Sequence, residues 1–213
     1  MRLRITFAKT KTMRFTSHLD LHRTWERTFR RARLPLAYSH GFNPRPRLNL
    51  GSALPLGFTG SQEILDAWLE DALPIPDILQ ALGQAAPPGI QIHQIEAIDE
   101  RAPALQTMLA ASNYTIILGE NLPGLEDRLN RLMQAENIPR QRRGKDYDLR
   151  PLVLDLQRLP DDANGCQRIH ARLKAQEGAT GRPDELLEEL GADPLAAQVN
   201  RDSLVFANLT PKP

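Results

Sequence analysis

Two histidines one helical turn apart begin the segment whose side chains are best suited to catalysis or metal binding. Residues 17–22 read SHLDLH, which places His18 and His22 four residues apart with Asp20 between them. Imidazoles at this spacing bind metals on helices, but the zinc-protease motif needs a glutamate where Leu19 stands. We therefore predict no metal site and no cofactor. The candidate catalytic groups, as general bases near neutral pH, are His18, Asp20, His22 and His40.

The helix predicted after Ser17 carries arginines on its outer side. An apolar stripe at helical spacing, Leu21, Trp25 and Phe29, would be buried. The residues that then point outward are Arg23, Arg27, Arg30 and Arg31, with Arg33 at the end. Cations near a helix C-terminus complement its dipole, but so many arginines exceed that need. We predict a phosphate-contacting face, and a solvated basic face is the alternative.

A loop without carboxylates follows this helix. Residues 36–51 read LAYSHGFNPRPRLNLG, and the acid-free run extends from Arg27 to Gln62. Its prolines stiffen the backbone around two arginines, and its aromatic rings offer surfaces on which unstacked bases stack. The residues predicted to contact RNA here are Tyr38, His40, Phe42, Asn43, Arg45 and Arg47. In the alternative interpretation the rings pack under a proline-rich turn and the arginines are solvated.

The third basic feature is the segment RQRRGKDYDLRP, residues 140–151. The residues predicted to extend the nucleic-acid surface are Arg140, Arg142, Arg143, Lys145 and Arg150. A hairpin turn at Gly144 explains the same segment in purely structural terms, and two aspartates dilute its charge.

The hydrophobic periodicity of the sequence predicts the strands and helices that would position these basic and aromatic side chains. Alternating apolar residues predict strands, and 3.6-residue spacing predicts helices, in the order βαββαβ over residues 1–98. The order repeats over residues 113–208, with a linker at 99–112 and a frayed tail at 209–213. Residues 140–159 are predicted to form one long strand or a bent pair. The fold class is therefore α+β, with duplicated ferredoxin-like (split βαβ) units and antiparallel sheets.

Charge is unevenly distributed along the 213 residues. Residues 1–50 carry twelve Lys or Arg against two acids, whereas residues 51–213 carry fifteen against twenty-four, although the net charge is only +1. Such segregation indicates a polyanionic ligand, or an acidic surface on this or another protein. The single cysteine, Cys166, excludes a disulfide within the chain and favours a reducing compartment. No signal peptide or membrane span is predicted, so we expect a cytoplasmic location and no membrane partner.

The segment FTSHLDLHRTWERTFRRARLPLAYSHGFNPRPRLNLGSALPLG resembles the core motif of the DUF2344 family, which is radical-SAM-linked. The resemblance runs from Phe15 through Gly57 and returns at residues 145–151. It implies that a domain of this kind is encoded beside, or fused to, a radical SAM protein. It also implies a functional core made of Ser17, His18, Asp20, Arg23, Tyr38, Gly41, Phe42, Asn43, Pro44, Arg150 and Pro151. Arg45 stands where many members have histidine, so a role for that histidine does not transfer.

Three functions fit these observations. The leading hypothesis is an RNA-binding accessory protein that acts on tRNA or rRNA with a radical SAM partner enzyme. The second is a scaffold that docks the partner through its basic face without RNA. The third is an RNA-processing or RNA-modifying enzyme that uses His18 or His40. The chain has no P-loop, GxGxxG or GxSxG motif and lacks the cysteines of an iron–sulfur cluster.

Overall fold

The computed structural model describes residues 1–142 and 144–207. It divides into two compact units, Met1–Met108 and Leu109–Pro213. Each unit combines helices with a sheet whose strand pairs are antiparallel. The α+β class predicted from periodicity is confirmed.

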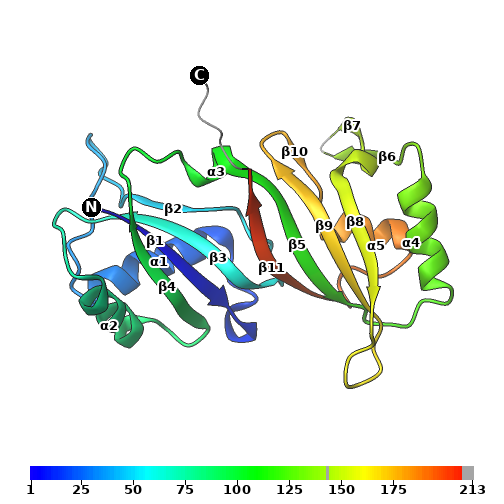
Figure 1. Ribbon diagram of the computed structural model, residues 1–213, viewed down its shortest axis with the longest axis horizontal. Coiled ribbons are helices and arrows are strands. Elements are labelled where there is room, and N and C mark those ends of the chain that lie inside the picture. The colour runs from blue at the N-terminus through cyan, green and yellow to red at the C-terminus, as the bar shows by residue number, and fades with distance from the viewer. Residues whose placement is uncertain (143, 208–213) are drawn as a thin grey trace. The chain divides into compact units, whose positions relative to one another are not determined.

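Unit 1 has the strand order β4-β1-β3-β2. Its elements are β1 Arg2–Lys9, the 3-10 turn Lys11–Met13, α1 His18–Arg31, β2 Leu48–Leu50, β3 Thr59–Trp68, α2 Ile75–Ala85, β4 Ile90–Ile98 and α3 Leu105–Met108. In Figure 1, α1 lies behind the sheet formed by these strands.

Unit 2 has the strand order β11-β5-β9-β8, with the short β10 also paired to β9. Its elements are β5 Leu109–Ile117, α4 Leu125–Gln134, β6 Pro139–Arg142, β7 Lys145–Asp148, the 3-10 turn Arg150–Leu152, β8 Val153–Leu159, β9 Arg168–Gln176, β10 Ala179–Thr180, α5 Pro183–Leu190 and β11 Gln198–Phe206. Both sheets thus place the fourth main strand beside the first, then the third and the second. This is the split βαβ arrangement, and the predicted duplication is confirmed.

The structure corrects one prediction of local structure in unit 2. Residues 140–159 form neither one strand nor a bent pair, because Gly144 turns the chain at φ 74° and separates β6 from β7. Pro151 then lies in a 3-10 turn before β8. The predicted linker, 99–112, contains α3 and the first residues of β5. The predicted tail, 209–213, lies outside the described residues.

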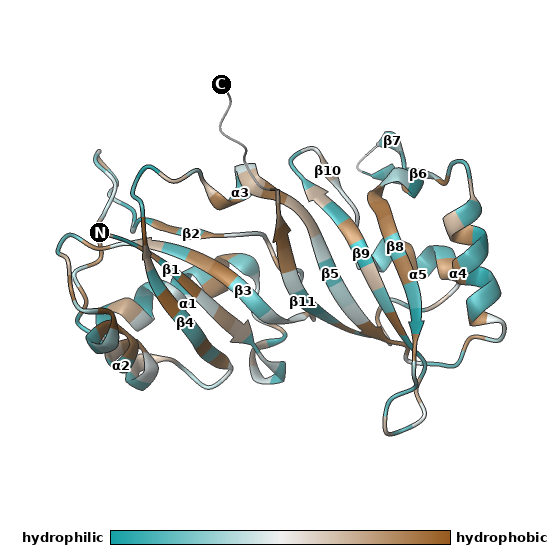
Figure 2. Ribbon diagram, in the orientation of Figure 1, coloured by the Kyte–Doolittle hydropathy of each residue, from teal (hydrophilic) through white to brown (hydrophobic). Residues whose placement is uncertain are grey.

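The core of unit 1 follows directly from the apolar periodicity. Leu3, Ile5 and Phe7 are fully buried on one face of β1, and the stripe of α1 packs against them. The rings of Phe7 and Trp25 meet edge to face, with centroids 4.9 Å apart. Figure 2 shows the same pattern as brown and teal bands along the strands. Burial of this stripe turns the arginines of α1 outward.

One carboxylate in this unit is completely buried. Asp66 on β3 accepts hydrogen bonds from the guanidinium of Arg2 at 2.6 Å and from that of Arg4 at 2.8 and 2.9 Å. Arg2 is itself only 2% exposed, and its guanidinium also lies 4.8 Å from the ring centroid of Trp68. These contacts neutralise the carboxylate and tie β1 to β3.

Candidate nucleic-acid interface

The SHLD segment builds the start of α1. The hydroxyl of Ser17 accepts from the backbone N–H of Asp20 at 3.2 Å and donates to the Asp20 carboxylate at 2.7 Å. Together with Arg23, 3.2 Å from Asp20, this hydroxyl holds the pKa of Asp20 below its ordinary value. Ser17 is therefore the N-cap of α1, and Asp20 is an ionised carboxylate in the first turn, at the positive end of the helix dipole.

The two histidines of this segment differ in their surroundings. His18 is the half-buried first residue of α1. The Nε2 of His22 lies 3.3 Å from the backbone carbonyl oxygen of Leu48. An N–H···O bond at this position requires the proton on Nε2, so His22 joins α1 to β2. His40 is exposed in the loop that follows α1.

The arginines of α1 fall into two groups. Arg23 pairs with Asp20, and Arg30 pairs with Glu26 at 2.9 Å. Exposed pairs of this kind contribute little to stability. Arg27 and Arg31 are exposed and have no ion pair among the residues that the structure describes. These two guanidiniums keep their hydrogen-bond donors available for a ligand.

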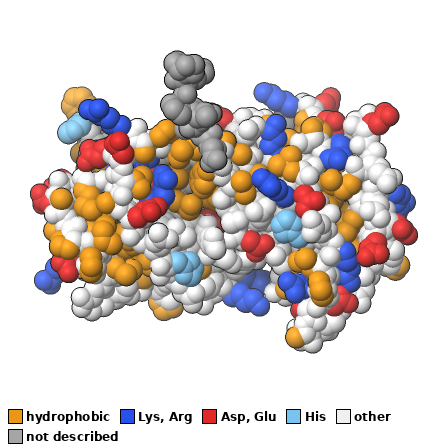
Figure 3. All heavy atoms as spheres, in the orientation of Figure 1, with side chains coloured by type: hydrophobic (Ala, Val, Ile, Leu, Met, Phe, Trp, Pro, Cys, Tyr) orange, Lys and Arg blue, Asp and Glu red, His pale blue; other side chains and the backbone are white. Residues whose placement is uncertain are grey.

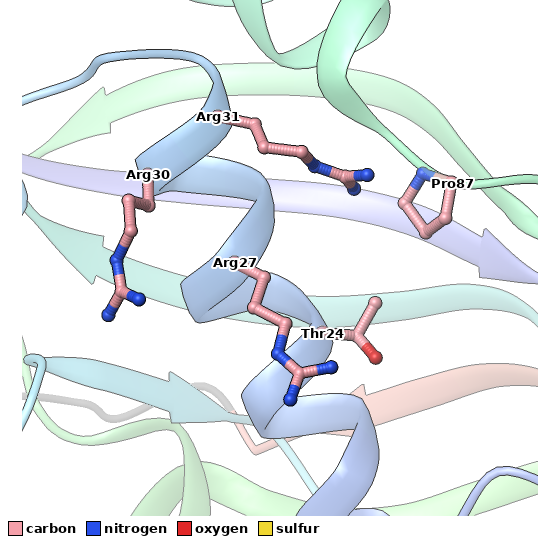
Figure 4. A pocket seen from close by; sticks show the side chains of 5 residues that line it. All are labelled: Thr24, Arg27, Arg30, Arg31 and Pro87. Atoms are coloured by element: carbon pink, nitrogen blue, oxygen red, sulfur yellow. The ribbon is translucent and has the colours of Figure 1, made fainter.

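A pocket of about 370 Å³ lies on this face of α1, lined by Thr24, Arg27, Arg30, Arg31 and Pro87. In Figure 4 the side chain of Arg31 extends toward Pro87, Arg27 lies beside Thr24, and Arg30 points away from the proline. Arginines from successive turns of one helix thus surround a surface that Pro87 completes from the connection after α2.

A second pocket of about 470 Å³ shares Arg31 and Pro87 with the first. Its other lining residues are Ala32, Arg33, Ala81, Gln84, Ala85, Ala86 and Pro88. We call the two together the α1–α2 groove. Arg33 adopts a left-handed φ of 55°, which costs a non-glycine residue about 1–2 kcal/mol. Arg33 thus lines the groove with a strained backbone conformation.

The acid-free loop is a hairpin tied to β3 at its base. The backbone N–H of Arg47 donates to Ala37 O at 2.8 Å, and that of Ser39 donates to Arg45 O at 2.8 Å. Ala37 in turn donates to Trp68 O at 2.7 Å. Gly41, at φ 136°, turns the chain at the tip. The hairpin presents its tip to solvent from an ordered base.

The predicted RNA-contacting residues of this hairpin are all exposed; they are Tyr38, His40, Phe42, Asn43, Arg45 and Arg47. The ring of Phe42 is fully exposed and that of Tyr38 is 39% exposed. Phe42 therefore does not pack beneath the proline-rich turn. The guanidinium of Arg47 lies 4.7 Å from the ring centroid of Trp68, so this arginine helps to hold the base of the hairpin. Arg45 has no ion pair in the described part of the chain.

The third basic segment uses its arginines within unit 2. Arg140 pairs with Glu189 at 2.6 Å, and Arg142 makes a two-pronged contact with Glu185. Arg150 donates to Val153 O at 2.7 Å and to Met133 O at 2.8 Å, which joins β8 to the end of α4. Lys145 is exposed, and Arg143 lies outside the described residues. The structural interpretation thus accounts for three of the five predicted cations.

Glu185 is the centre of a polar cluster beside this hairpin. Burial alone would raise the pKa of Glu185, but hydrogen bonds from Arg142 and Tyr147 outweigh it and hold the pKa below the ordinary 4.5. Burial, together with the same carboxylate, raises the pKa of Tyr147. The cluster therefore contains an ionised glutamate and a neutral phenol.

This cluster predicts how the stability of unit 2 depends on pH. A lowered folded-state pKa stabilises the fold above the unfolded-state pKa, and that stabilisation disappears as the pH falls through the folded-state value. We expect the melting temperature of unit 2 to decrease as the pH is lowered past about 4.5. Glu185→Gln should remove part of that dependence, whereas the exposed Glu188→Gln should not. An unchanged acid profile for Glu185→Gln would contradict the assignment, and carboxyl NMR titration measures it directly.

Two further observations concern the whole described chain. No helix in residues 1–142 and 144–207 is both long and apolar enough to cross a membrane. Within the same residues, no three His, Cys, Asp or Glu side chains are grouped so as to hold a metal ion. On the face seen in Figure 3, Lys and Arg side chains are scattered among acidic ones.

The fold and these surfaces define a tandem ferredoxin-like α+β protein with an arginine-lined groove and an aromatic hairpin in its first unit. The family model DUF2344, described as an uncharacterized protein conserved in bacteria, matches residues 2–183. The chain belongs to this family. No significant match is found among curated proteins.

Two solved structures resemble the chain distantly. A chain of a Cbf5-Nop10-Gar1 complex has 12% identity and a TM-score of 0.48, over 95% of this chain and 48% of that one. The present chain thus spans about half the length of that relative. A putative glycine cleavage system transcriptional repressor has 12% identity and a TM-score of 0.24, over 96% of both chains. Neither likeness bears on function.

Several residues of the interface carry no signal in the linear sequence. Pro87, Pro88 and Gln84 lie more than fifty residues after α1, and only the packing of α2 on α1 brings them to the arginines. A second unanticipated feature is an apolar cluster near the start of α1, formed by Phe15, Leu19 and Leu56, each more than 60% exposed. The Gly57 N–H donates to Arg14 O at 2.9 Å, which brings the segments around Phe15 and Leu56 together.

Proposed function

We propose that the protein is an RNA-binding accessory protein of the cytoplasm that holds tRNA or rRNA for a radical SAM partner enzyme. The observation that carries the proposal is the exposed cationic and aromatic surface of unit 1. Arg27, Arg31 and Arg45 are available to phosphates, and Phe42 presents a solvent-exposed ring.

The chemistry of this surface fits RNA better than it fits a small anion. Forked guanidiniums bind phosphate oxygens with two hydrogen bonds, and an exposed ring stacks on an unpaired base. An aromatic ring adds nothing to a site for free phosphate. Residues 27–62 contribute no carboxylate to this surface, which limits the repulsion of a polyanion there.

The proposal assigns different tasks to the two parts of the surface. The arginines of α1 hold the RNA backbone, and the hairpin of residues 37–47 binds an unpaired base. His40 and Asn43 are placed by sequence beside Phe42 and contact the base edge or the sugar. Arg47 serves mainly through its stack on Trp68, which keeps the hairpin in position.

Binding of the purified chain to total tRNA over a range of salt concentrations tests the proposal. We expect tight binding whose logarithm falls linearly with the logarithm of salt concentration, because each phosphate contact releases counterions. Phe42→Ala combined with Arg45→Ala should weaken binding at every salt concentration and lower the slope by about 0.7–0.9, one phosphate contact. The control is Arg172→Ala, which removes one exposed arginine from unit 2. Wild-type chain that does not bind tRNA even at low salt would refute the proposal.

A second candidate function is docking of the radical SAM partner without RNA. The exposed cluster of Phe15, Leu19 and Leu56 favours this role, since leucines stack poorly on bases but fill apolar pockets on proteins. The guanidinium of Arg14 lies 4.3 Å from the ring centroid of Phe15, so the cluster has a basic border.

Co-purification after nuclease treatment separates the two roles. A partner enzyme that stays bound after RNA is digested, and is lost with Leu19→Ser and Leu56→Ser, indicates docking through the apolar cluster. Loss of the partner on nuclease treatment alone indicates that RNA bridges the two proteins.

A further inference from the structure

We propose that the α1–α2 groove holds an unpaired RNA strand and distinguishes ribose from deoxyribose through backbone carbonyls at the end of α2. This inference rests on the proposed function and names the kind of nucleic acid that one of its sites takes. Three properties of the groove carry it: its cations, its carbonyls and its apolar floor.

The cations of the groove suit the backbone of one strand. Arg27 and Arg31 are one turn apart on α1, so their Cα atoms are separated by about 6 Å along the helix axis. This separation is comparable to the distance between neighbouring phosphates of a single strand. Arg33 continues the row into the second pocket. None of the three is paired with an acid within residues 1–142 and 144–207.

The end of α2 supplies acceptors that the chain itself leaves without helical donors. Ala86 donates to Leu82 O at 2.8 Å, which is the last hydrogen bond of the helix. Ala86 is extended at ψ 135°, which ends the helix, and residues 87 and 88 are prolines, which have no N–H. The carbonyls of Gly83 and Gln84 thus have no donor four residues on, and Gln84 lines the groove.

A backbone carbonyl without a donor favours some ligand groups over others. It accepts a hydrogen bond from a hydroxyl group and repels a phosphate oxygen. RNA carries a 2′-hydroxyl donor on every nucleotide, and DNA carries none. The groove thus combines cations for phosphates with Gln84, whose carbonyl has no helical donor, and this combination matches a ribonucleotide strand.

The apolar floor of the groove favours a single strand over a duplex. Between the arginines and the end of α2 lie apolar residues, namely Ala32, Ala81, Ala85, Ala86, Pro87 and Pro88. A single strand covers such a floor with ribose and base faces. A duplex presents phosphates and groove edges on its outside, so the proline rings would stay in contact with water.

Binding of labelled oligonucleotides tests this inference. The probes share one sequence of about ten nucleotides, within the range of single-strand sites, made as RNA, as DNA and as 2′-O-methyl RNA. We expect RNA to bind at least about fivefold more tightly than the other two, since the methylated sugar accepts but does not donate. A hairpin duplex of the same composition should bind more weakly than the single strand.

Two variants locate the effect in the groove. Pro88→Ala adds a backbone N–H beside the end of α2, and we expect it to lower the affinity for RNA more than the affinity for DNA. Pro76→Ala, at the other end of α2, is its control. Arg27→Ala with Arg31→Ala should lower the salt slope for single-stranded RNA by about 1.4, two contacts at 0.7 each. Arg101→Ala with Arg172→Ala removes the same charge elsewhere and should not lower it.

The outcomes separate this inference from the proposed function. Equal affinity for RNA, DNA and 2′-O-methyl RNA, or an unchanged salt slope in the Arg27/Arg31 variant, overturns the inference and leaves tRNA binding standing. Failure of the wild-type chain to bind tRNA or any oligonucleotide overturns both. Circular dichroism confirms that each variant is folded.

Discussion

Arg27→Glu combined with Arg31→Glu is expected to lower the affinity for tRNA by about 100-fold or more at moderate salt. Hydrogen bonds to charged groups contribute about 1.5–3 kcal/mol each, and every 1.4 kcal/mol is about a factor of ten in affinity. Both side chains are exposed and have no ion pair among the described residues, so their replacement breaks no contact that the fold needs. The loss should be largest at low salt, where the repulsion from the new carboxylates is least screened.

The matched control reverses the same amount of charge at a different place. Arg101→Glu with Arg172→Glu changes the net charge by the same four units, and both arginines are exposed. We expect this control to bind tRNA within a few-fold of the wild type. If the two double variants lose affinity equally, net charge alone governs binding, and α1 has no special role.

Asp66→Ala is expected to destabilise unit 1 by about 3–5 kcal/mol, because it leaves the buried guanidinium of Arg2 without its counter-charge. The carboxylate is fully buried and accepts from two arginines. A domain is usually stable by only about 5–15 kcal/mol, so the variant should unfold at far lower urea concentration. Both tryptophans, Trp25 and Trp68, belong to unit 1, and their fluorescence follows its unfolding separately from unit 2.

A second substitution tests the origin of this effect. Asp66→Met with Arg2→Met removes the carboxylate and the most deeply buried of its two partners, and should cost less than Asp66→Ala alone. A loss below about 1 kcal/mol for Asp66→Ala would mean that the ion pair behaves like a surface pair, contrary to its burial.

Much of the fold could be predicted because the signals are local. Leu21, Trp25 and Phe29 define the buried side of α1 from spacing alone, and the outward direction of its arginines follows. The duplicated strand order could be predicted from two successive βαββαβ patterns. The turn at Gly144 was one interpretation of the sequence, but the separation of β6 and β7 from β8 was not predicted, because the two strands have four residues each and are mostly polar.

The parts of the site that escaped prediction depend on contacts between distant residues. Arg142 and Glu185 are 43 residues apart, and nothing in either local sequence indicates that they pair. The same holds for the stack of Arg47 on Trp68. A basic run in sequence therefore does not reveal which of its cations are already paired. The role of the remaining cations in binding RNA stays a prediction.

One side chain belongs to both the core and the hairpin base. The guanidinium of Arg2 pairs with Asp66, and it shares the ring of Trp68 with Arg47. We expect a ligand that immobilises the hairpin also to restrain β1 through this ring. Backbone amides of β1 should then exchange with deuterium more slowly in the complex than in the free protein. Such a result would show that the hairpin is coupled to the centre of the unit without any change of fold.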